Sequence, residues 1–192
     1  MTRKTPTHLA LAATLALGLA GTAQAVEYGT LDTAASRVGF RYTQMGVTLD
    51  GQFKQFSAQL RFDPARPEAA AATVEVPLAG IDTGSPEGDD EVKAKTWFDT
   101  ANHPVARFVA SAVKPLGNSR FEIAGQLSIK GKTRPVSFPA TFTPGTPTAT
   151  FEGTLPLQRG DFAIGEGEWS GFDIVANKVD VIFHLVARPL AK

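Results

Sequence analysis

The sequence predicts one all-β domain, an antiparallel barrel or sandwich of about eight strands with a single short helix. Short segments in which apolar and polar residues alternate recur along most of the chain, and this is the period of a half-buried strand. The 192 residues include 18 Gly and 13 Pro, a composition that suits closely spaced turns. Because no long helical pattern separates the strands, a parallel sheet of βαβ units is disfavoured.

The clearest predicted element is a β-hairpin over residues 121–142. Its first half is apolar at every second position up to Ile129, and the alternation restarts at Val136. The turn between the two halves contains Gly131, which can adopt a positive φ. We therefore expect one face of each strand to be buried.

Two prolines in the second strand of this hairpin, Pro135 and Pro139, predict where its hydrogen bonding fails. Residues two apart in a strand direct their N–H groups to the same side, so both prolines remove donors from one edge. We expect the first strand of the hairpin to pair with the intact edge. On the opposite edge we expect a frayed ladder, an opening in the barrel or no neighbour.

The same alternation predicts the other strands, at residues 37–42, 56–62, 74–78, 108–112, 149–159 and 179–185. Asp50-Gly51 is a strong turn signal and is expected to end a strand. Phe53 is out of phase with the strand that follows it, which indicates a β-bulge.

One segment departs from the strand pattern. Ser85-Pro86-Glu87 combines an N-cap residue, a proline at the first helical position and an acidic first turn, so we expect a short helix from Pro86 to about Thr96. The acidic residues here fit a helix start rather than a calcium-binding loop. Trp97 and Phe98 follow, and we expect this pair to act as a lid or plug against the mouth of a barrel.

The first 25 residues have the organisation of a secretory signal peptide. Arg3 and Lys4 precede an apolar run, which is followed by the small-x-small cleavage pattern Ala23-Gln24-Ala25. The run is shorter than the ~20 residues of a membrane-spanning helix, so cleavage after Ala25 is favoured over an uncleaved anchor. The mature domain, residues 26–192, is then expected outside the cytoplasm, which in a bacterium is the periplasm.

Composition disfavours several classes of function. Lys and Arg total 19, as do Asp and Glu, so no charge excess favours nucleic acid, and without cysteine there is no thiolate metal site. Two approximations to the G-x-S-x-G motif, around Ser85 and Ser170, have the serine misplaced. His103 is expected in a loop and His184 on an outward strand face, which is too little for a triad or a metal site. We expect no enzyme, no metal and no cofactor.

A series of short motifs in the mature chain resembles the YceI-like proteins. In order they are Leu31-Asp32, Arg37-x-Gly-Phe40, Gly51-Gln-Phe53, Phe62-Asp63-Pro64, Asp90-Glu-Val-Lys93, Trp97-Phe98-Asp99, Gly125-Gln-Leu-Ser-Ile-Lys-Gly131 and Arg159-Gly-Asp-Phe-Ala-Ile-Gly165. The resemblance implies a lipocalin-like antiparallel β-barrel in the periplasm that holds a long polyisoprenoid or other lipid tail. Two histidines that many members carry are replaced here, within Ala35-Ser36-Arg37 and Gln44-Met45-Gly46-Val47, so any role for them is absent.

A second resemblance concerns the C-terminal part of the chain. Residues 165–170 and 176–179 resemble a subgroup of the family expected to work near membrane electron-transfer proteins. This resemblance implies an isoprenoid quinone as the ligand and an inner-membrane oxidoreductase as a partner.

The interior of the barrel has two alternative descriptions. An eight-stranded barrel is just wide enough either to be filled by side chains or to hold one slender ligand. A filled core would make the chain a non-catalytic docking or accessory protein of an inner-membrane electron-transfer system, with Trp97 and Trp169 as exposed anchors. A hollow one would place a lipid tail against the inward-facing residues Phe40, Tyr42, Phe56, Leu60, Phe62, Phe108, Ile123, Leu127, Val136, Phe138, Phe142, Phe151, Leu155, Arg159 and Phe183.

Arg159 is the one charged residue in the inward phase of its strand. A buried guanidinium needs a partner. We expect either a salt bridge to a carboxylate such as Asp161 or Asp173, or contact with the polar head of a ligand.

Overall fold

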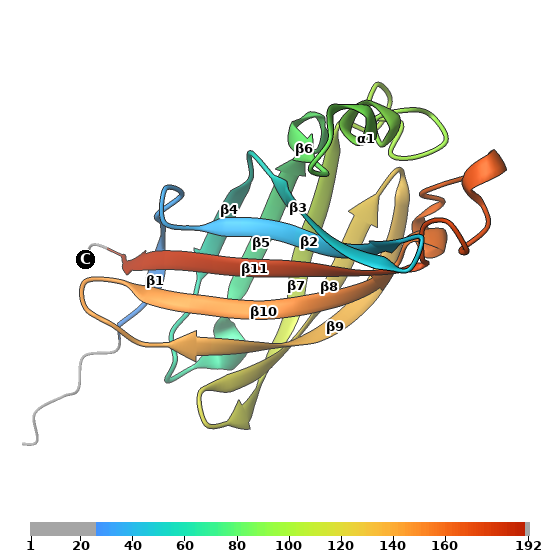
Figure 1. Cartoon of the computed structure of the whole chain (residues 1–192). Helices are drawn as coiled ribbons and strands as arrows, with labels where there is room; N and C mark the ends of the chain where they lie inside the picture. Colours follow the sequence, from blue (N-terminus) through green and yellow to red (C-terminus); the bar gives the residue numbers. More distant parts are fainter. Residues whose placement is uncertain (1–25, 191–192) are drawn as a thin grey trace, which may run out of the picture.

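The computed structural model describes residues 26–190. Most of this part of the chain forms one antiparallel sheet, which is curled into a barrel with an inner and an outer face (Figure 1). The strands are β1 (Tyr28–Leu31), β2 (Arg37–Gln44), β3 (Val47–Phe53), β4 (Ser57–Arg61), β5 (Ala71–Pro77), β6 (Ile81–Asp82), β7 (Val105–Gly117), β8 (Arg120–Ile129), β9 (Lys132–Thr143), β10 (Ala149–Gln158) and β11 (Lys178–Pro189). The only α-helix in this part of the chain is α1 (Pro86–Glu91), and the 3₁₀ turns are Pro67–Ala69, Leu78–Gly80, Arg159–Phe162 and Gly167–Trp169. The predicted all-β antiparallel fold with one short helix is confirmed, and the predicted signal peptide lies outside the described residues.

The strands follow the order β4-β5-β7-β8-β9-β10-β11-β2-β3-β6 around the sheet. At one end of the barrel, β1 connects the two edges of the sheet. It pairs with β11, and Tyr28 exchanges two backbone hydrogen bonds of 2.8 and 2.9 Å with Phe62, which follows β4. At the other end β6 pairs with β3 and the chain then enters α1, which lies over the end of the barrel (Figure 1). We call these the β1 end and the lid end.

The β8–β9 hairpin has the predicted register and the predicted weak edge. Its two-residue turn, Lys130-Gly131, has φ of 49° and 69°, the geometry of a type I′ turn. β9 pairs with β8 from Lys132 to Thr141, across both prolines, whereas its ladder with β10 extends only from Ala140 to Thr143. Pairing with β10 therefore stops at the residue next to Pro139, and the expectation of a frayed ladder on that edge is confirmed.

The β2–β3 hairpin corrects two predictions. The turn is at Met45-Gly46, both with positive φ, and Asp50-Gly51 lies inside β3. Gly51 is required there by packing, because a Cβ at this position would overlap the ring of Phe40 on β2. Phe53 marks the end of β3 and not a bulge, since β4 begins as a separate strand at Ser57.

Helix α1 begins as predicted and ends earlier. The Ser85 hydroxyl accepts a 3.0 Å hydrogen bond from the backbone N–H of Gly88, and Pro86 occupies the first turn. The helix stops at Glu91, and turns carry the chain through Trp97 to Asp99, which has a φ of 50°. No helix within residues 26–190 has the length and apolarity that crossing a membrane requires.

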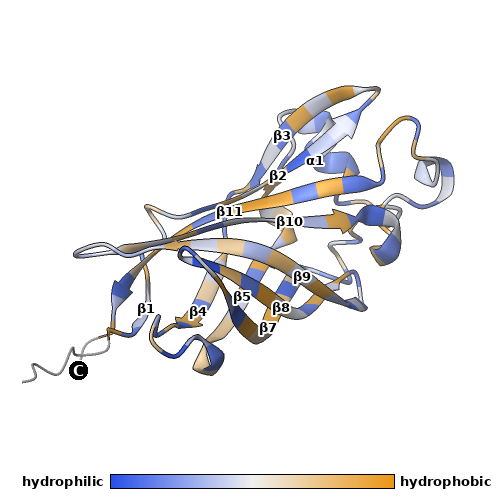
Figure 2. Cartoon of the chain, turned by 90° about the horizontal axis from the view of Figure 1, so that it is seen from below, coloured by the Kyte–Doolittle hydropathy of each residue, from blue (hydrophilic) through white to orange (hydrophobic). Residues whose placement is uncertain are grey.

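The buried side chains form two clusters, one toward each end of the barrel. Hydrophobic and hydrophilic residues alternate along β7, β8 and β9 in Figure 2, as the period-two pattern requires. At the β1 end the ring of Phe62 lies 5.0 to 5.2 Å from the rings of Phe121, Phe142 and Phe151, so that end is filled by aromatic side chains. The second cluster, toward the lid end, contains Trp97, Leu127, Ile129, Phe138, Leu155, Leu157, Phe162, Ile164 and Val175.

Candidate ligand-binding site

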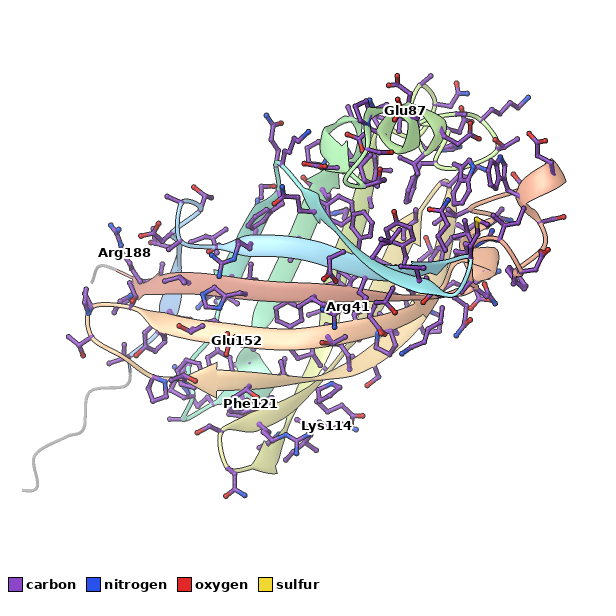
Figure 3. All side chains as sticks on the ribbon, viewed as in Figure 1. Arg41, Glu87, Lys114, Phe121, Glu152 and Arg188 are labelled. Carbon is purple, nitrogen blue, oxygen red and sulfur yellow. The ribbon has the colours of Figure 1, made fainter. Side chains whose placement is uncertain are left out.

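A cavity of about 450 Å³ lies at the lid end of the barrel. We call residues 85–98 the lid, and Glu87 marks its position above the barrel in Figure 3, far from Arg188 at the β1 end. The barrel wall contributes Phe40, Tyr42, Gln44, Phe53, Leu78, Ile81, Ala106, Ile129, Leu157, Val179 and Val181. The lid contributes Ser85, Glu87, Gly88, Glu91, Val92, Trp97 and Phe98, and the loop before β11 contributes Arg159, Ile164, Trp169 and Val175.

The volume and the lining suit an apolar ligand. Binding pockets for small molecules typically enclose about 300–1,000 Å³ behind mostly apolar walls with a few polar groups. Tyr42 is one of those polar groups, and its hydroxyl donates a 3.2 Å hydrogen bond to the Thr83 carbonyl. Burial, with a smaller contribution from Asp89, raises the pKa of Tyr42, so the phenol stays neutral.

Three glycines on the inner face explain how so many phenylalanines fit in the barrel wall. A Cβ at Gly51 would overlap the ring of Phe40, and Cβ atoms at Gly125 and Gly153 would overlap the rings of Phe108 and Phe183 in the same way. Each ring therefore lies along the wall, over a glycine of the neighbouring strand, and does not project across the barrel.

Arg159 is 2% exposed and lies in a cage of backbone carbonyls beside the cavity. Its Nη1 donates to Ile164 (2.7 Å) and Gly165 (3.2 Å). The remaining donors reach the carbonyls of Trp169 (2.8 Å), Gly171 (2.7 Å), Val175 (2.9 Å from Nη2) and Ala176 (3.3 Å). The guanidinium also lies 5.4 Å from the ring centre of Trp97 and 4.9 Å from that of Phe172.

This cage corrects both expectations for Arg159. Asp161 and Asp173 are exposed, and no carboxylate of residues 26–190 forms an ion pair with the guanidinium. All of its N–H groups are directed at carbonyls, so none is left over for a ligand head. Burial lowers the pKa of Arg159, but a guanidinium remains protonated, so a positively charged group stays beside the cavity.

The predicted lining residues fall into three groups. Phe40, Tyr42 and Arg159 line the cavity. Leu127, Phe138 and Leu155 are buried in the lid-end cluster, with Phe108, Ile123, Val136 and Phe183 packed against it. Phe62, Phe142 and Phe151 are buried in the filled β1 end with Leu60 against them, and Phe56 is half-buried before β4. A role in binding for these residues stays a prediction.

Sequence reasoning named Trp97-Phe98 as a lid or plug, and both residues line the cavity. It missed most other lining residues, on the strands (Ile129, Leu157, Val179 and Val181) as well as outside them. Trp97 and Trp169 were expected as exposed docking anchors. Instead, Trp97 is 7% exposed and Trp169 is half-buried, and their ring centres are 5.5 Å apart. Two tryptophans in adjacent loops were the available signal for this part of the site. Their burial removes the anchors that the docking alternative needs.

His103 and His184 lie away from the cavity. His184 Nδ1 is 2.7 Å from Glu152 Oε1, and the two residues are directly opposite on β11 and β10. Glu152 is labelled on the outside of the sheet in Figure 3. His103 lies against the hairpin turn at Gly131. Residues 26–190 contain no group of three or more His, Asp or Glu side chains arranged to hold a metal ion.

An antiparallel barrel that is packed at one end and hollow beneath a lid at the other defines a protein of the lipocalin-like class. The family profile described as the YceI-like domain matches residues 30–187, and the chain belongs to this family.

Three comparisons place the chain among known proteins. It is 35% identical to a UPF0312 protein of Pseudomonas savastanoi pv. phaseolicola over 164 residues, which cover 81% of this chain and 85% of that protein. It is similar to the crystal structure of Burkholderia cenocepacia BcnA, with a TM-score of 0.80 and 42% identity, covering 82% of this chain and 99% of that one. A polyisoprenoid binding domain from Saccharophagus degradans shares the fold, with a TM-score of 0.67 at 15% identity and coverage of 86% and 99%.

Proposed function

We propose that this protein is a periplasmic binding protein that carries a long polyisoprenoid or another lipid tail in the cavity beneath its lid. The observation that carries the proposal is the apolar cavity itself, lined by Trp97 and Phe98 among others at the unfilled end of the barrel. The polyisoprenoid-binding domain with the same fold supports this class of ligand. The periplasmic location rests on the predicted signal peptide, and an isoprenoid quinone with an inner-membrane oxidoreductase as partner rests on the subgroup resemblance of residues 165–170.

The energetics of such a carrier are favourable. Each buried methylene contributes about 0.8 kcal/mol, so about ten of them contribute roughly 8 kcal/mol. A micromolar dissociation constant corresponds to about 8 kcal/mol, before the cost of ordering the tail is subtracted. Binding therefore requires no specific polar contact along the tail, and we propose a binding role in place of catalysis.

Native mass spectrometry of the protein after gentle purification from the periplasm tests the proposal. We expect a lipid to co-purify with the wild type and to be lost from Ala106→Trp, which adds an indole to the cavity wall. Val109→Trp is the matched control, because Val109 lies on the same strand with an exposed side chain. Thermal unfolding should change little in either variant.

Two outcomes would overturn the proposal. Absence of lipid from the wild type, together with no uptake of added long-chain lipid, would show that the cavity is not a binding site. Unfolding of Ala106→Trp but not of Val109→Trp would show that the space beside Ala106 is already required for packing.

A further inference from the structure

Two hydrogen-bond donors beside the cavity have no acceptor. Trp97 Nε1 and Trp169 Nε1 are both buried, and neither has a hydrogen-bond partner within residues 26–190. Both residues line the cavity, and they are the only two tryptophans of the chain. A buried indole N–H normally finds a partner, so two unpaired donors with ring centres 5.5 Å apart require an explanation.

Four backbone carbonyls of the lid and the neighbouring loop already accept hydrogen bonds from other donors. Arg159 takes the carbonyls of Trp169, Ile164 and Gly165 in its cage. The carbonyl of Thr96, next to Trp97, accepts from the backbone N–H groups of both Gly165 and Glu166 at 2.9 and 2.7 Å. The loop and the lid are thereby joined to each other, and their backbone has little acceptor capacity left for the indoles.

The charge at this point also favours an acceptor. Arg159 has no carboxylate partner in the described chain, and its guanidinium lies 5.4 Å from the Trp97 ring centre. The carboxylates of Glu87 and Glu91 also line the cavity, from α1, but neither accepts from an indole nitrogen. An electronegative oxygen placed at the indoles would gain both hydrogen bonds and the field of the buried cation.

We infer that the bound lipid carries a hydrogen-bond-accepting oxygen at its head, and that the indole N–H groups of Trp97 and Trp169 bind this oxygen while the tail fills the cavity. This inference rests on the proposed function and adds the chemistry of the ligand head to it. Because both nitrogens are covered by protein atoms, the head reaches them as the Gly167–Trp169 turn moves. The backbone hydrogen bonds at the end of that turn are long, 3.2 and 3.3 Å, and the movement would also have to release the 2.8 Å hydrogen bond from Arg159 to the Trp169 carbonyl.

Indole N–H resonances in a ¹⁵N–¹H correlation spectrum give a direct test. The spectrum of the mature protein contains two such signals, which Trp97→Phe and Trp169→Phe assign. One probe is geranylgeranyl methyl ether, whose oxygen only accepts hydrogen bonds, and the other is the hydrocarbon with the same prenyl tail and no oxygen. Both probes are delivered from the same detergent micelles.

We expect the ether to move the indole protons downfield, as a new hydrogen bond does, and the hydrocarbon to leave them without that shift. Both probes should perturb the methyl signals of Ile129 and Val181 in the cavity wall. Identical indole spectra with the two probes would overturn the inference while the methyl changes uphold the carrier function. If neither probe perturbs the methyl signals, the carrier function fails instead.

Affinity provides an independent measure. The wild type should bind the ether about tenfold more tightly than the hydrocarbon, a difference of about 1.4 kcal/mol. The Trp97→Phe/Trp169→Phe variant should lose this preference and keep its affinity for the hydrocarbon. Phe98→Leu, which changes a lining side chain without a donor, is the control and should keep the preference. A preference retained by the double variant would show that another group binds the head.

Discussion

The ammonium group of Lys130 lies 2.8 Å from Glu166 Oε2 and 2.7 Å from the carbonyl oxygen of Ala163. Lys130 is the first residue of the β8–β9 turn, and its side chain is only 8% exposed. The contact therefore fastens the hairpin to the loop that encloses Arg159 and carries Trp169. Through Thr96, which accepts from the backbone of Glu166, the same loop is joined to the lid.

This ion pair predicts a specific response to acid. The hydrogen bond from Lys130 lowers the pKa of Glu166 below its usual value near 4.5. A carboxyl group with a lowered folded-state pKa stabilises the fold above its unfolded pKa, and the contribution is lost as pH falls through the folded pKa. We expect the melting temperature to decrease as the pH is lowered past about 4.5. The melting temperature of Glu166→Gln should already be lower at neutral pH, because the ion pair is absent, and should therefore decrease less on acidification. Glu168→Gln, exposed in the same loop, should follow the wild-type profile, and identical profiles for all three proteins would contradict the prediction.

Replacing Arg159 by Met should destabilise the fold. The substitution retains most of the stem but leaves the carbonyls of Ile164, Gly171 and Val175 without their donor in a buried place. We expect the free energy of unfolding in urea to fall by about 3 kcal/mol. Arg134→Met, at an exposed position of β9, should change it by less than about 0.5 kcal/mol. Equal losses in the two variants would show that the cage contributes nothing beyond a surface arginine.

Gly153 should tolerate no side chain. A Cβ there would overlap the Phe183 ring and come within 2.8 Å of the Pro139 carbonyl oxygen, so we expect Gly153→Ala to cost about 2 kcal/mol in urea unfolding. Replacing the ring by a smaller side chain, in the double variant Gly153→Ala/Phe183→Leu, should recover part of that loss. Gly80→Ala is the control, because its nearest contact would be an ordinary 3.6 Å. If Gly153→Ala is as stable as the wild type, the rings do not rest against the glycines.

The lid should respond to ligand more than the barrel does. α1 has six residues and none of them is buried, whereas β8 pairs on both sides along most of its length. Backbone amides of residues 85–98 are therefore expected to exchange hydrogen faster than those of β8. Added long-chain lipid should slow the lid and leave β8 unchanged. Equal protection of the lid with and without lipid would mean that it packs permanently on the barrel.

Local alternation was sufficient to predict the hairpin and its blocked edge. Pro135 and Pro139 lack a donor wherever they are placed, and period two fixes which side of the strand they affect. Asp50-Gly51 shows the limit of such local signals, since a strong turn sequence lies inside β3 because Phe40 needs the space beside Gly51. The place of Asp50-Gly51 within a strand depends on packing against a residue of another strand, and such contacts cannot be predicted from neighbouring residues in the sequence.

Only a small part of the candidate site was predicted from the sequence. The inward phase places Phe40 and Tyr42 in the cavity wall, and the two aromatic residues after the acidic helix indicate a lid. The partners of Arg159 could not be predicted, because they are backbone carbonyls, which every residue has. For the same reason the unpaired indoles of Trp97 and Trp169 become visible only when the acceptors around them are assigned.

The missing ladder between β9 and β10 has a consequence for selectivity. From Pro139 to the turn, β9 has no register with β10. Near the lid end these two strands are therefore held together by side chains, through the cluster that contains Phe138 and Leu155 and through the Lys130–Glu166 ion pair. The circumference of the barrel at that end therefore depends on side-chain packing and not on a backbone ladder. We expect such packing to adapt to tails of unequal thickness, so that the proposed carrier distinguishes its ligands poorly by bulk.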